Sequence, residues 1–416
     1  MIYPANFEEK IGFDRIREQV TALCSTPSAK AKLAEEGFST SADEIERRLS
    51  LMNEMRSLLM LERDFPDGDY PDPAPLVAKI RVEGSYLLAA EADQLRKALV
   101  TVGAIAEFIL GRGGARYPRL WELSRRVTLF PEIVRAIDVI LDDRGEVKDS
   151  ASPELQQVRR AIREREGQAA KRLQQVLQRA KQAGIVDADA VLSVRDGRPV
   201  IPVAAANKRK LQGFIHDESA TGRTFYVEPV EVVEINNELK ELEYAERREV
   251  VKVLSAFTES IRPDAEAIAD AGDYLSSVDM IRAKARWALA NDAGKPILST
   301  DDRLELRTAR HPLLQQTLRA QGREVVPLDL ALDRRKHILV ISGPNAGGKS
   351  VCLKTTGLMQ YLFQCGYPVP ASEVSELPVF RSIFIDIGDE QSIDDDLSTY
   401  SSHLRNMKNM LAGASD

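Results

Sequence analysis

The stretch HILVISGPNAGGKSVCLKTTG, residues 337–357, joins an apolar run to a glycine-rich loop and then to a helical pattern. Its residues 343–350 fit GxxxxGK[ST] between an expected strand and an expected helix, which is the setting of a phosphate-binding loop. Glycines let the backbone curl so that its N–H groups face phosphate oxygens, and the helix start adds partial positive charge. The sequence therefore predicts a nucleotide site, with a chance glycine-rich turn as the alternative.

Two side chains of this loop carry the expected chemistry. Lys349 is expected to reach the β- and γ-phosphates of ATP, and the Ser350 hydroxyl to bind the accompanying Mg²⁺. ATP and Mg²⁺ are therefore the expected cofactors. The four histidines are scattered, which argues against a zinc or di-metal site built on imidazole. The loop residues expected to bind nucleotide are Gly343, Pro344, Asn345, Ala346, Gly347, Gly348, Lys349 and Ser350.

Hydrolysis needs a carboxylate that holds magnesium and another that positions water. Asp386 follows the apolar run 382–385, and Asp389 and Glu390 follow in turn. Taken alone, these residues favour a Walker B strand at this point. The wider region 296–416 alternates strand-like runs with helical patterns, which predicts an α/β domain with a largely parallel sheet.

The runs that predict this domain are spread over the whole region. One helix is expected over 349–366, ended by Gly366. The strand-like runs are LRTARHPLL (306–314), VVPLDLAL (325–332), HILVIS (337–342) and RSIFIDIGD (381–389).

The chain before this region is mostly helical in pattern. Residues 1–150 repeat apolar side chains at 3–4 spacing. A polar helix is expected from Ser152 as N-cap and Pro153 to Gly184, and helical spacing returns from Val230 to about Leu289. Between them, an alternating segment turns at the dipeptide Asp-Gly (196–197), which is typical of a tight hairpin. These features predict a helical arm with a β tip; a helical domain with an inserted hairpin is the alternative.

Composition indicates a cytoplasmic protein. The three cysteines, Cys24, Cys352 and Cys365, lack CxxC spacing and are expected to be reduced thiols. The N-terminus lacks the apolar core of a signal peptide, and no apolar run reaches membrane-spanning length. Net charge is −7, so the whole chain gives no sign of a nucleic-acid binder.

Local charge differs from the whole-chain value. Residues 151–215 hold 13 Lys and Arg against 6 Asp and Glu, a balance of +7. Such a segment suits salt-dependent, sequence-independent contact with a phosphate backbone, and a solvated helix face is the alternative. The residues expected to contact nucleic acid are Arg159, Arg160, Arg163, Arg195, Arg198, Lys208, Arg209 and Lys210.

Several motifs together resemble one ATPase family. GPNAGGKS (343–350), TARHPLL (308–314) and DIGDEQSIDDDLSTYSSHL (386–404) resemble the MutS family, most closely its bacterial paralogues of the second type, whose full-length members end in an Smr domain. RDGRPVIPV (195–203) and GFIHDESATGRTFYVEP (213–229) resemble the clamp of that branch. The resemblance covers nearly the whole chain. Like that branch, the chain is expected to lack the mismatch-reading domains of true mismatch sensors.

The resemblance implies roles that the residues alone do not. The family's Walker B strand, switch histidine, dimerising helices and nuclease domain come later than Asp416, so the chain is expected to be a fragment with its catalytic residue unknown. It is expected to bind ATP without efficient hydrolysis. Ser398 and Thr399 would begin a helix facing the partner subunit's γ-phosphate, or form an ordinary N-cap. Val326 and His311 would lie beside the nucleotide base, unless His311 is a buried structural histidine.

The expected fold class is α+β and multidomain. The domains are a helical core and lever (1–150), an arm with β clamp (151–230), returning arm and lever helices (231–295), and an incomplete P-loop ATPase domain (296–416). One hypothesis is an ATP-gated homodimeric clamp on branched or duplex DNA that suppresses homologous recombination, with endonuclease activity in a later domain. The other is a rescue factor that binds rRNA of collided ribosomes and splits them. A scaffold without activity is the third reading.

Overall fold

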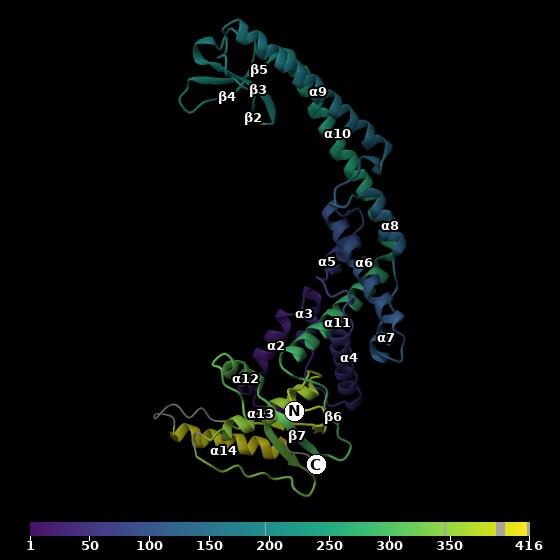
Figure 1. The fold of residues 1–416 in the computed structure, drawn as a ribbon, viewed down its shortest axis with the longest axis vertical. Helices are drawn as coiled ribbons and strands as arrows, with labels where there is room; N and C mark the ends of the chain where they lie inside the picture. The colour runs from purple at the N-terminus through teal and green to yellow at the C-terminus, as the bar shows by residue number, and fades with distance from the viewer. Residues whose placement is uncertain (196, 345–346, 388–395, 414–416) are drawn as a thin grey trace. The chain divides into compact units, whose positions relative to one another are not determined.

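The computed structural model describes the chain except residues 196, 345–346, 388–395 and 414–416, and the side chains of 396–403 and 405. The described chain divides into two compact units, each made of separate segments (Figure 1). The head unit comprises Met1–Val77, Lys97–Phe130 and Glu266–Asp416, and the arm unit comprises Ala78–Arg96 and Pro131–Ala265. The chain contains both helices and strands and is of the mixed α+β class. The four sequential domains expected from the sequence remain a prediction.

The head unit is mainly helical, as its 3–4 apolar spacing predicts. Ser41 and Thr26 cap two of its helices by accepting hydrogen bonds from backbone N–H groups, as expected of hydroxyl side chains at helix starts. Its helices, three of which continue into the arm unit, are α1 (Phe7–Ile11), α2 (Phe13–Ala22), α3 (Pro27–Glu35), α4 (Ala42–Leu61), α5 (Ala74–Ile80), α6 (Ala89–Gly111), α7 (Pro118–Ser124), α11 (Ala265–Ala290), α12 (Pro312–Arg319), α13 (Lys349–Gln364) and α14 (Asp396–Gly413).

Two hydrophobic clusters hold the head unit together, and α11 contributes to both. Trp287 of α11 is buried in the cluster that also contains Phe13 and Phe363. Leu275 and Val278 of the same helix belong to the second cluster. Burial of this much apolar surface is the main stabilising contribution to such a unit. Helix α11 therefore contributes to both clusters: the one that contains residues of α13, and the one that contains residues of α4, α6 and α7.

The strands of the head unit form a mixed sheet, so the expectation of a largely parallel sheet is wrong for the described residues. Four strands run in the order β6-β9-β7-β8, and only β6 and β9 are parallel. A separate parallel pair joins β1 to β10. The strands are β1 (Ile2–Tyr3), β6 (Ile297–Leu298), β7 (Leu304–Ala309), β8 (Leu328–Leu332), β9 (Glu376–Leu377) and β10 (Ile383–Phe384).

The apolar run before the glycine-rich loop differs most from expectation. Residues 337–342 are all described and form no strand. The side chains of Ile338 and Val340 are 77% and 83% exposed. A strand exists only where a neighbour completes its hydrogen-bond ladder, and apolar composition supplies only the tendency. Residues 312–314, expected to continue a strand, instead begin α12, with Pro312 at its first position.

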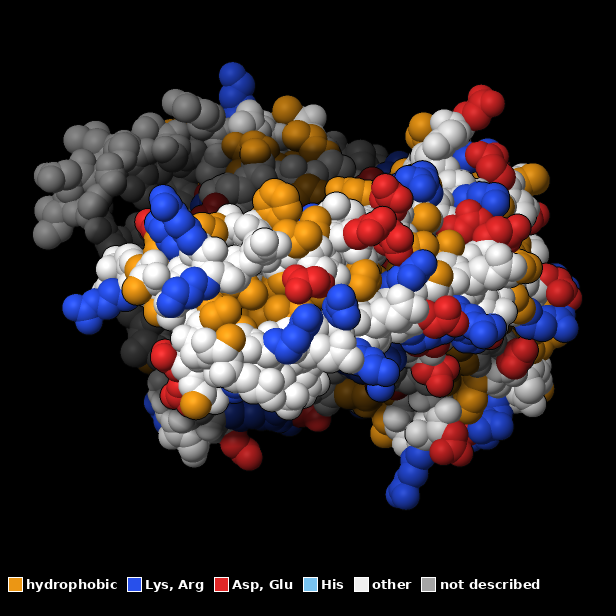
Figure 2. Space-filling model, turned by 90° about the horizontal axis from the view of Figure 1, so that it is seen from above, with side chains coloured by type: hydrophobic (Ala, Val, Ile, Leu, Met, Phe, Trp, Pro, Cys, Tyr) orange, Lys and Arg blue, Asp and Glu red, His pale blue; other side chains and the backbone are white. Residues whose placement is uncertain are grey.

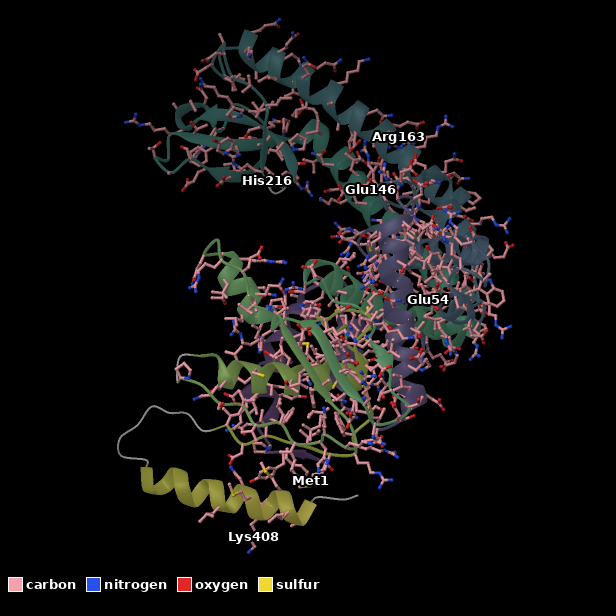
Figure 3. The ribbon with its side chains drawn as sticks, turned by 60° about the horizontal axis from the view of Figure 1, so that its bottom comes forward. Met1, Glu54, Glu146, Arg163, His216 and Lys408 are labelled. Atoms are coloured by element: carbon pink, nitrogen blue, oxygen red, sulfur yellow. The ribbon has the colours of Figure 1, made fainter. Side chains whose placement is uncertain are left out.

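The helix after the loop is confirmed. Helix α13 begins at Lys349, and Gly366, with a φ of +69°, follows its end as the helix stop that glycine provides best. Helix α14 closes the described chain. A Cβ on Gly413 would lie 3.2 Å from Met1 Sδ, so the N-terminal residue packs beside the end of α14 (Figure 3).

The arm unit is a pair of long helices with a small sheet at one end, as the polar helices around an Asp-Gly turn predict. Helices α9 and α10 run side by side, and the sheet lies at the end where they connect (Figure 1). Ser152 caps α9 by accepting from the backbone N–H of Leu155 at 3.0 Å. The helices are α8 (Pro131–Ile140), η1 (Asp149–Ala151), α9 (Pro153–Gln182), η2 (Ala205–Asn207), α10 (Val230–Ile261) and η3 (Arg262–Asp264).

The sheet of the arm unit is antiparallel in the order β2-β3-β5-β4. Arg195 pairs with Arg198 across the first hairpin, in the register that the Asp-Gly dipeptide predicts, and residue 196 itself lies outside the described residues. Ile201 and Val227 pack against Leu173 and Val176 of α9. The strands are β2 (Ser193–Arg195), β3 (Arg198–Ala204), β4 (Gly213–Glu218) and β5 (Thr224–Pro229).

None of the helices in the described part of the chain is both long and apolar enough to cross a membrane.

Candidate nucleotide loop and charged arm

The glycine-rich loop takes backbone conformations that suit glycine. Gly343 has a φ of +149°, and Gly348, the N-cap of α13, has a φ of +83°. A Cβ on Gly347 would lie 3.0 Å from the carbonyl oxygen of Pro344, so the loop leaves little room there. These conformations turn the chain sharply into the first turn of a 16-residue helix. Asn345 and Ala346, also expected to bind nucleotide, lie outside the described residues.

Lys349 and Ser350 occupy the first turn of α13. Lys349 Nζ donates to the carbonyl oxygen of Gly343 over 2.7 Å, so this side chain reaches back across the loop. Ser350 is exposed. A lysine over the loop and a hydroxyl at the helix start form a donor set that suits phosphate and Mg²⁺. The residues present therefore fit the cofactors that the sequence predicts.

Asp386 lies close to the elements that flank the loop. It comes after β10 and lines an apolar cavity of about 460 Å³, which Ile341 before the loop and Leu353 on α13 also line. Asp386 Oδ1 accepts from Asn406 Nδ2 of α14 over 2.8 Å. The structure thus brings one of the three acidic candidates toward the loop region, while Asp389 and Glu390 lie outside the described residues.

His311 has the features of the structural alternative. Its ring is largely buried, and burial lowers the pKa of His311 to about 4, more than a hydrogen bond with the backbone of Ile11 raises it. Lys354 of α13 also lowers this pKa, so His311 lies near the helix that opens at the loop. The side chain is neutral at pH 7. Its role beside a base remains a prediction.

Val326 and the pair Ser398–Thr399 are placed only in part. Val326 precedes β8 and its side chain is 88% exposed, so packing on adenine remains a prediction. Ser398 and Thr399 lie in the first turn of α14, which begins at Asp396, and their side chains lie outside the described residues. Their contact with a partner's phosphate likewise remains a prediction.

Half of the eight basic residues expected to bind nucleic acid form ion pairs that hold the arm itself together. Arg159 bridges Asp149 and Glu246 at 2.8 and 2.7 Å, which ties η1 and α9 to α10. Arg163, labelled in Figure 3, also pairs with Asp149, at 2.9 Å. Similar pairs join Arg195 to Asp217 at 2.8 Å and Arg198 to Glu228 at 2.9 Å. The charge count in the sequence therefore overstates the charge available to a polyanion.

A buried network surrounds Glu228, and no sequence pattern indicated it. The Glu228 side chain is 1% exposed and accepts from Asn236 Nδ2 at 2.6 Å, pairs with His216 Nε2 at 2.6 Å, and accepts from Arg198 at 2.9 Å. Burial would raise the pKa of Glu228, but these three partners together hold it below its usual value. The network fixes the start of α10 to the sheet, on which Figure 3 labels His216. The three partners lie 8 to 30 residues from Glu228 in the sequence, at no spacing that a helix or strand pattern would indicate.

Part of the accessible charge lies after η2. Lys208, Arg209 and Lys210 are all exposed, and Lys208 Nζ lies 4.5 Å from the centre of the Phe225 ring. Arg223 is exposed in the β4–β5 turn and was not among the residues predicted to bind nucleic acid. Figure 2 shows Lys and Arg side chains projecting around the sheet end, on the left of the view, with hydrophobic side chains among them. Arg160 is also exposed but pairs with Glu164 at 3.0 Å.

The matches to known proteins cover both the loop and the arm. Residues 339–416 match the protein family described as MutS domain V. Endonuclease MutS2 of Bacillus velezensis is 34% identical over 406 residues, which is 97% of this chain and 51% of that protein. Endonuclease MutS2 of Thermomicrobium roseum is 36% identical, over 94% of this chain and 50% of that protein.

These matches support a MutS2-type family member. The match to these MutS2 proteins runs through head and arm alike, since it covers nearly the whole chain. The loop 343–350 falls within the residues matched to MutS domain V. The chain spans about half the length of the MutS2 relatives that it matches.

Proposed function

We propose that the chain is an ATP-dependent nucleic-acid clamp of the MutS2 type. The observation that carries the proposal is the loop, in which Gly348 opens α13 and Lys349 reaches back to Gly343. The loop residues and the start of α13 hold the phosphates, and Ser350 holds Mg²⁺, which would neutralise phosphate charge when bound. In a homodimer, Ser398 and Thr399 would face the nucleotide of the partner.

Nucleotide binding is the first test. A fluorescent ATP analogue is titrated against the chain with and without Mg²⁺. Lys349→Ala should weaken binding by about tenfold to a hundredfold, because a charge-assisted contact to phosphate contributes about 1.5–3 kcal/mol. Lys336→Ala, a matched change at an exposed site, should leave it unchanged. Equal affinity for Lys349→Ala and the parent chain would contradict the proposed site.

We expect slow hydrolysis by residues 1–416 alone. Asp386 is held by Asn406 and borders an apolar cavity, which is a poor setting for a magnesium carboxylate. Steady-state phosphate release measures this. Turnover that is abolished by both Lys349→Ala and Asp386→Asn would overturn the expectation and make Asp386 the carboxylate that holds magnesium.

The nucleic acid is proposed to be duplex or branched DNA, held at its phosphates by the exposed residues 208–210 and Arg223. The proposed outcome of DNA binding is suppression of recombination, and the names of the MutS2 relatives state endonuclease activity for those proteins. Competition between labelled branched DNA and purified ribosomes tests the target. DNA binding that ribosomes displace at lower concentration than unlabelled DNA would favour the ribosome-rescue reading instead.

A further inference from the structure

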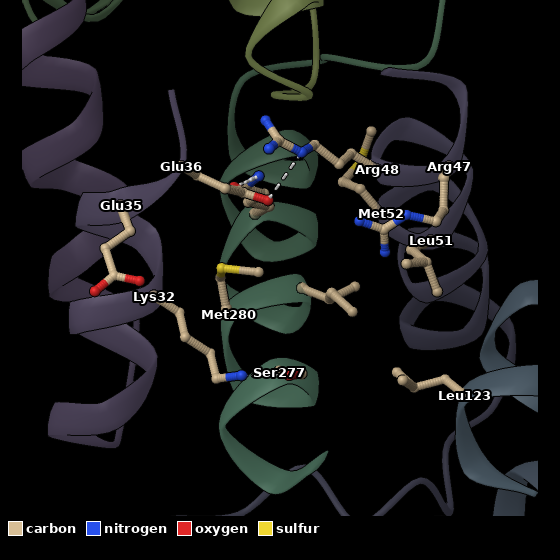
Figure 4. A pocket seen from close by; sticks show the side chains of 12 residues that line it. Lys32, Glu35, Glu36, Arg47, Arg48, Leu51, Met52, Leu123, Ser277 and Met280 are labelled. Atoms are coloured by element: carbon tan, nitrogen blue, oxygen red, sulfur yellow. Dashed lines mark hydrogen bonds and ion pairs between the residues drawn. The ribbon is translucent and has the colours of Figure 1, made fainter. Parts of the chain in front are cut away.

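A groove in the head unit has no part in the proposed function. It has a volume of about 340 Å³ and lies along α11 between α3 and α4, with α7 at one edge (Figure 4). Volumes of this size hold small ligands. It shares no lining residue with the apolar cavity beside Asp386. A ligand here would therefore be separate from the nucleotide.

The lining of the groove is apolar in the middle and charged around it. Four cationic and two acidic side chains give it an excess of two positive charges. The apolar lining residues are Leu51, Met52, Leu123, Met280 and Ile281. The charged ones are Lys32, Arg47, Arg48, Lys284, Glu35 and Glu36. This combination suits a molecule with an apolar body and a negative group.

The Glu36 charge inside the groove is already neutralised. Glu36 pairs with the buried Lys284 and lies 3.7 Å from Arg48, as the dashed lines in Figure 4 show. Arg48 also pairs with Glu44 at 2.5 Å. These cationic and acidic groups are committed to each other, so Glu36 presents little net negative charge to a ligand.

Arg47 and Lys32 are the two lining cations that do not pair with Glu36, and Glu35 is the acidic side chain that lines the groove beside them. Arg47 is exposed, and within the described chain it forms no ion pair. It also lines an adjoining cavity of about 220 Å³, together with Arg119 and Arg126. Lys32 pairs with Asp273 at 2.6 Å, but that carboxylate is 67% exposed, so the pair is weak and exchangeable. A planar guanidinium can hold a carboxylate, sulfonate or phosphate by two parallel hydrogen bonds.

We propose that this groove binds a small organic anion with an apolar body. Arg47 holds the negative group, with help from Lys32, and Met280, Ile281 and Leu51 cover the body. The groove is too small for a polynucleotide, and the proposal does not depend on the ATP loop.

The test uses 1-anilinonaphthalene-8-sulfonate, an aromatic sulfonate, with the methionine methyl groups labelled for NMR. Met52 and Met280 line the groove, whereas Met410 lines the apolar cavity beside Asp386 and reports binding there. The resonances of Met52 and Met280 should shift on titration. Arg47→Glu should raise the midpoint about tenfold or more, since a charge-assisted contact becomes repulsive.

A matched variant controls for charge alone. Arg63→Glu makes the same change at an exposed position of the head unit that lines neither cavity, and it should leave the midpoint unchanged. Shifts confined to Met410, an equal effect of both variants, or no shift of any methyl group would each overturn the proposal.

Discussion

Lys284 of α11 and Glu36, which follows α3, form a buried ion pair with side chains 3% and 13% exposed. Lys284 Nζ also donates to the carbonyl oxygen of Gly366 over 3.2 Å and lies 4.4 Å from the centre of the Tyr367 ring. Gly366 follows α13, whose other end is the glycine-rich loop. One buried cation thus joins α3, α11 and the end of the loop's helix.

Lys284→Met should destabilise the head unit by about 3 kcal/mol, because it leaves Glu36 poorly compensated in a buried site. Chemical denaturation measures the free energy of unfolding. The double variant Lys284→Met/Glu36→Gln should recover part of that loss, because no buried charge is then left unpaired. A double variant less stable than Lys284→Met would show that the side chains do not act as a pair.

The parts of this fold that the sequence predicted correctly are those set by neighbouring residues. Ser152 and Pro153 mark the start of α9, and Gly366 marks the end of α13, because caps and stops depend on local backbone chemistry. The run 337–342 has strand composition but no strand, since a strand also needs a distant partner. The candidate site follows the same rule. The loop motif is local and was predicted, whereas a charge count does not show which carboxylates pair with Arg159 and Arg198.

Two glycines at or near the loop should respond to alanine in opposite directions. Gly348→Ala places a Cβ at a φ of +83° and should cost about 1–2 kcal/mol while weakening nucleotide binding. Gly357 lies inside α13, where the Cβ added by Gly357→Ala would make ordinary contacts of 3.7 and 3.8 Å with Ile11 and Ile385. It should stabilise by about 0.5–1 kcal/mol, since alanine favours the helix. Thermal unfolding with and without the nucleotide analogue distinguishes the two; a stabilising Gly348→Ala would contradict the loop geometry.

His311 should make stability fall in mildly acid solution. Its folded pKa is about 4 and its unfolded value 6.5, so the unfolded chain binds more protons between these limits. Stability associated with His311 is therefore complete above pH 6.5 and is lost as pH falls toward 4, by on the order of 3 kcal/mol. His311→Gln should flatten this part of the curve, measured as unfolding free energy between pH 7 and 4. His337→Gln, at an exposed position, should not; identical curves for His311→Gln and the parent chain would rule out the assignment.

Arg209 and Lys210 should account for more of the DNA affinity than other exposed basic residues of the arm unit. Both are exposed after η2, and neither forms an ion pair within the described chain. Arg209→Ala/Lys210→Ala should weaken duplex binding and reduce the slope of log affinity against log salt by about 0.9 for each phosphate that is no longer neutralised. The matched control is Arg247→Ala/Arg248→Ala, which removes two exposed charges from α10. Fluorescence anisotropy across a salt series measures both slopes. Equal effects of the two variants would mean that DNA senses the overall charge of the arm and that the residues after η2 form no distinct DNA site.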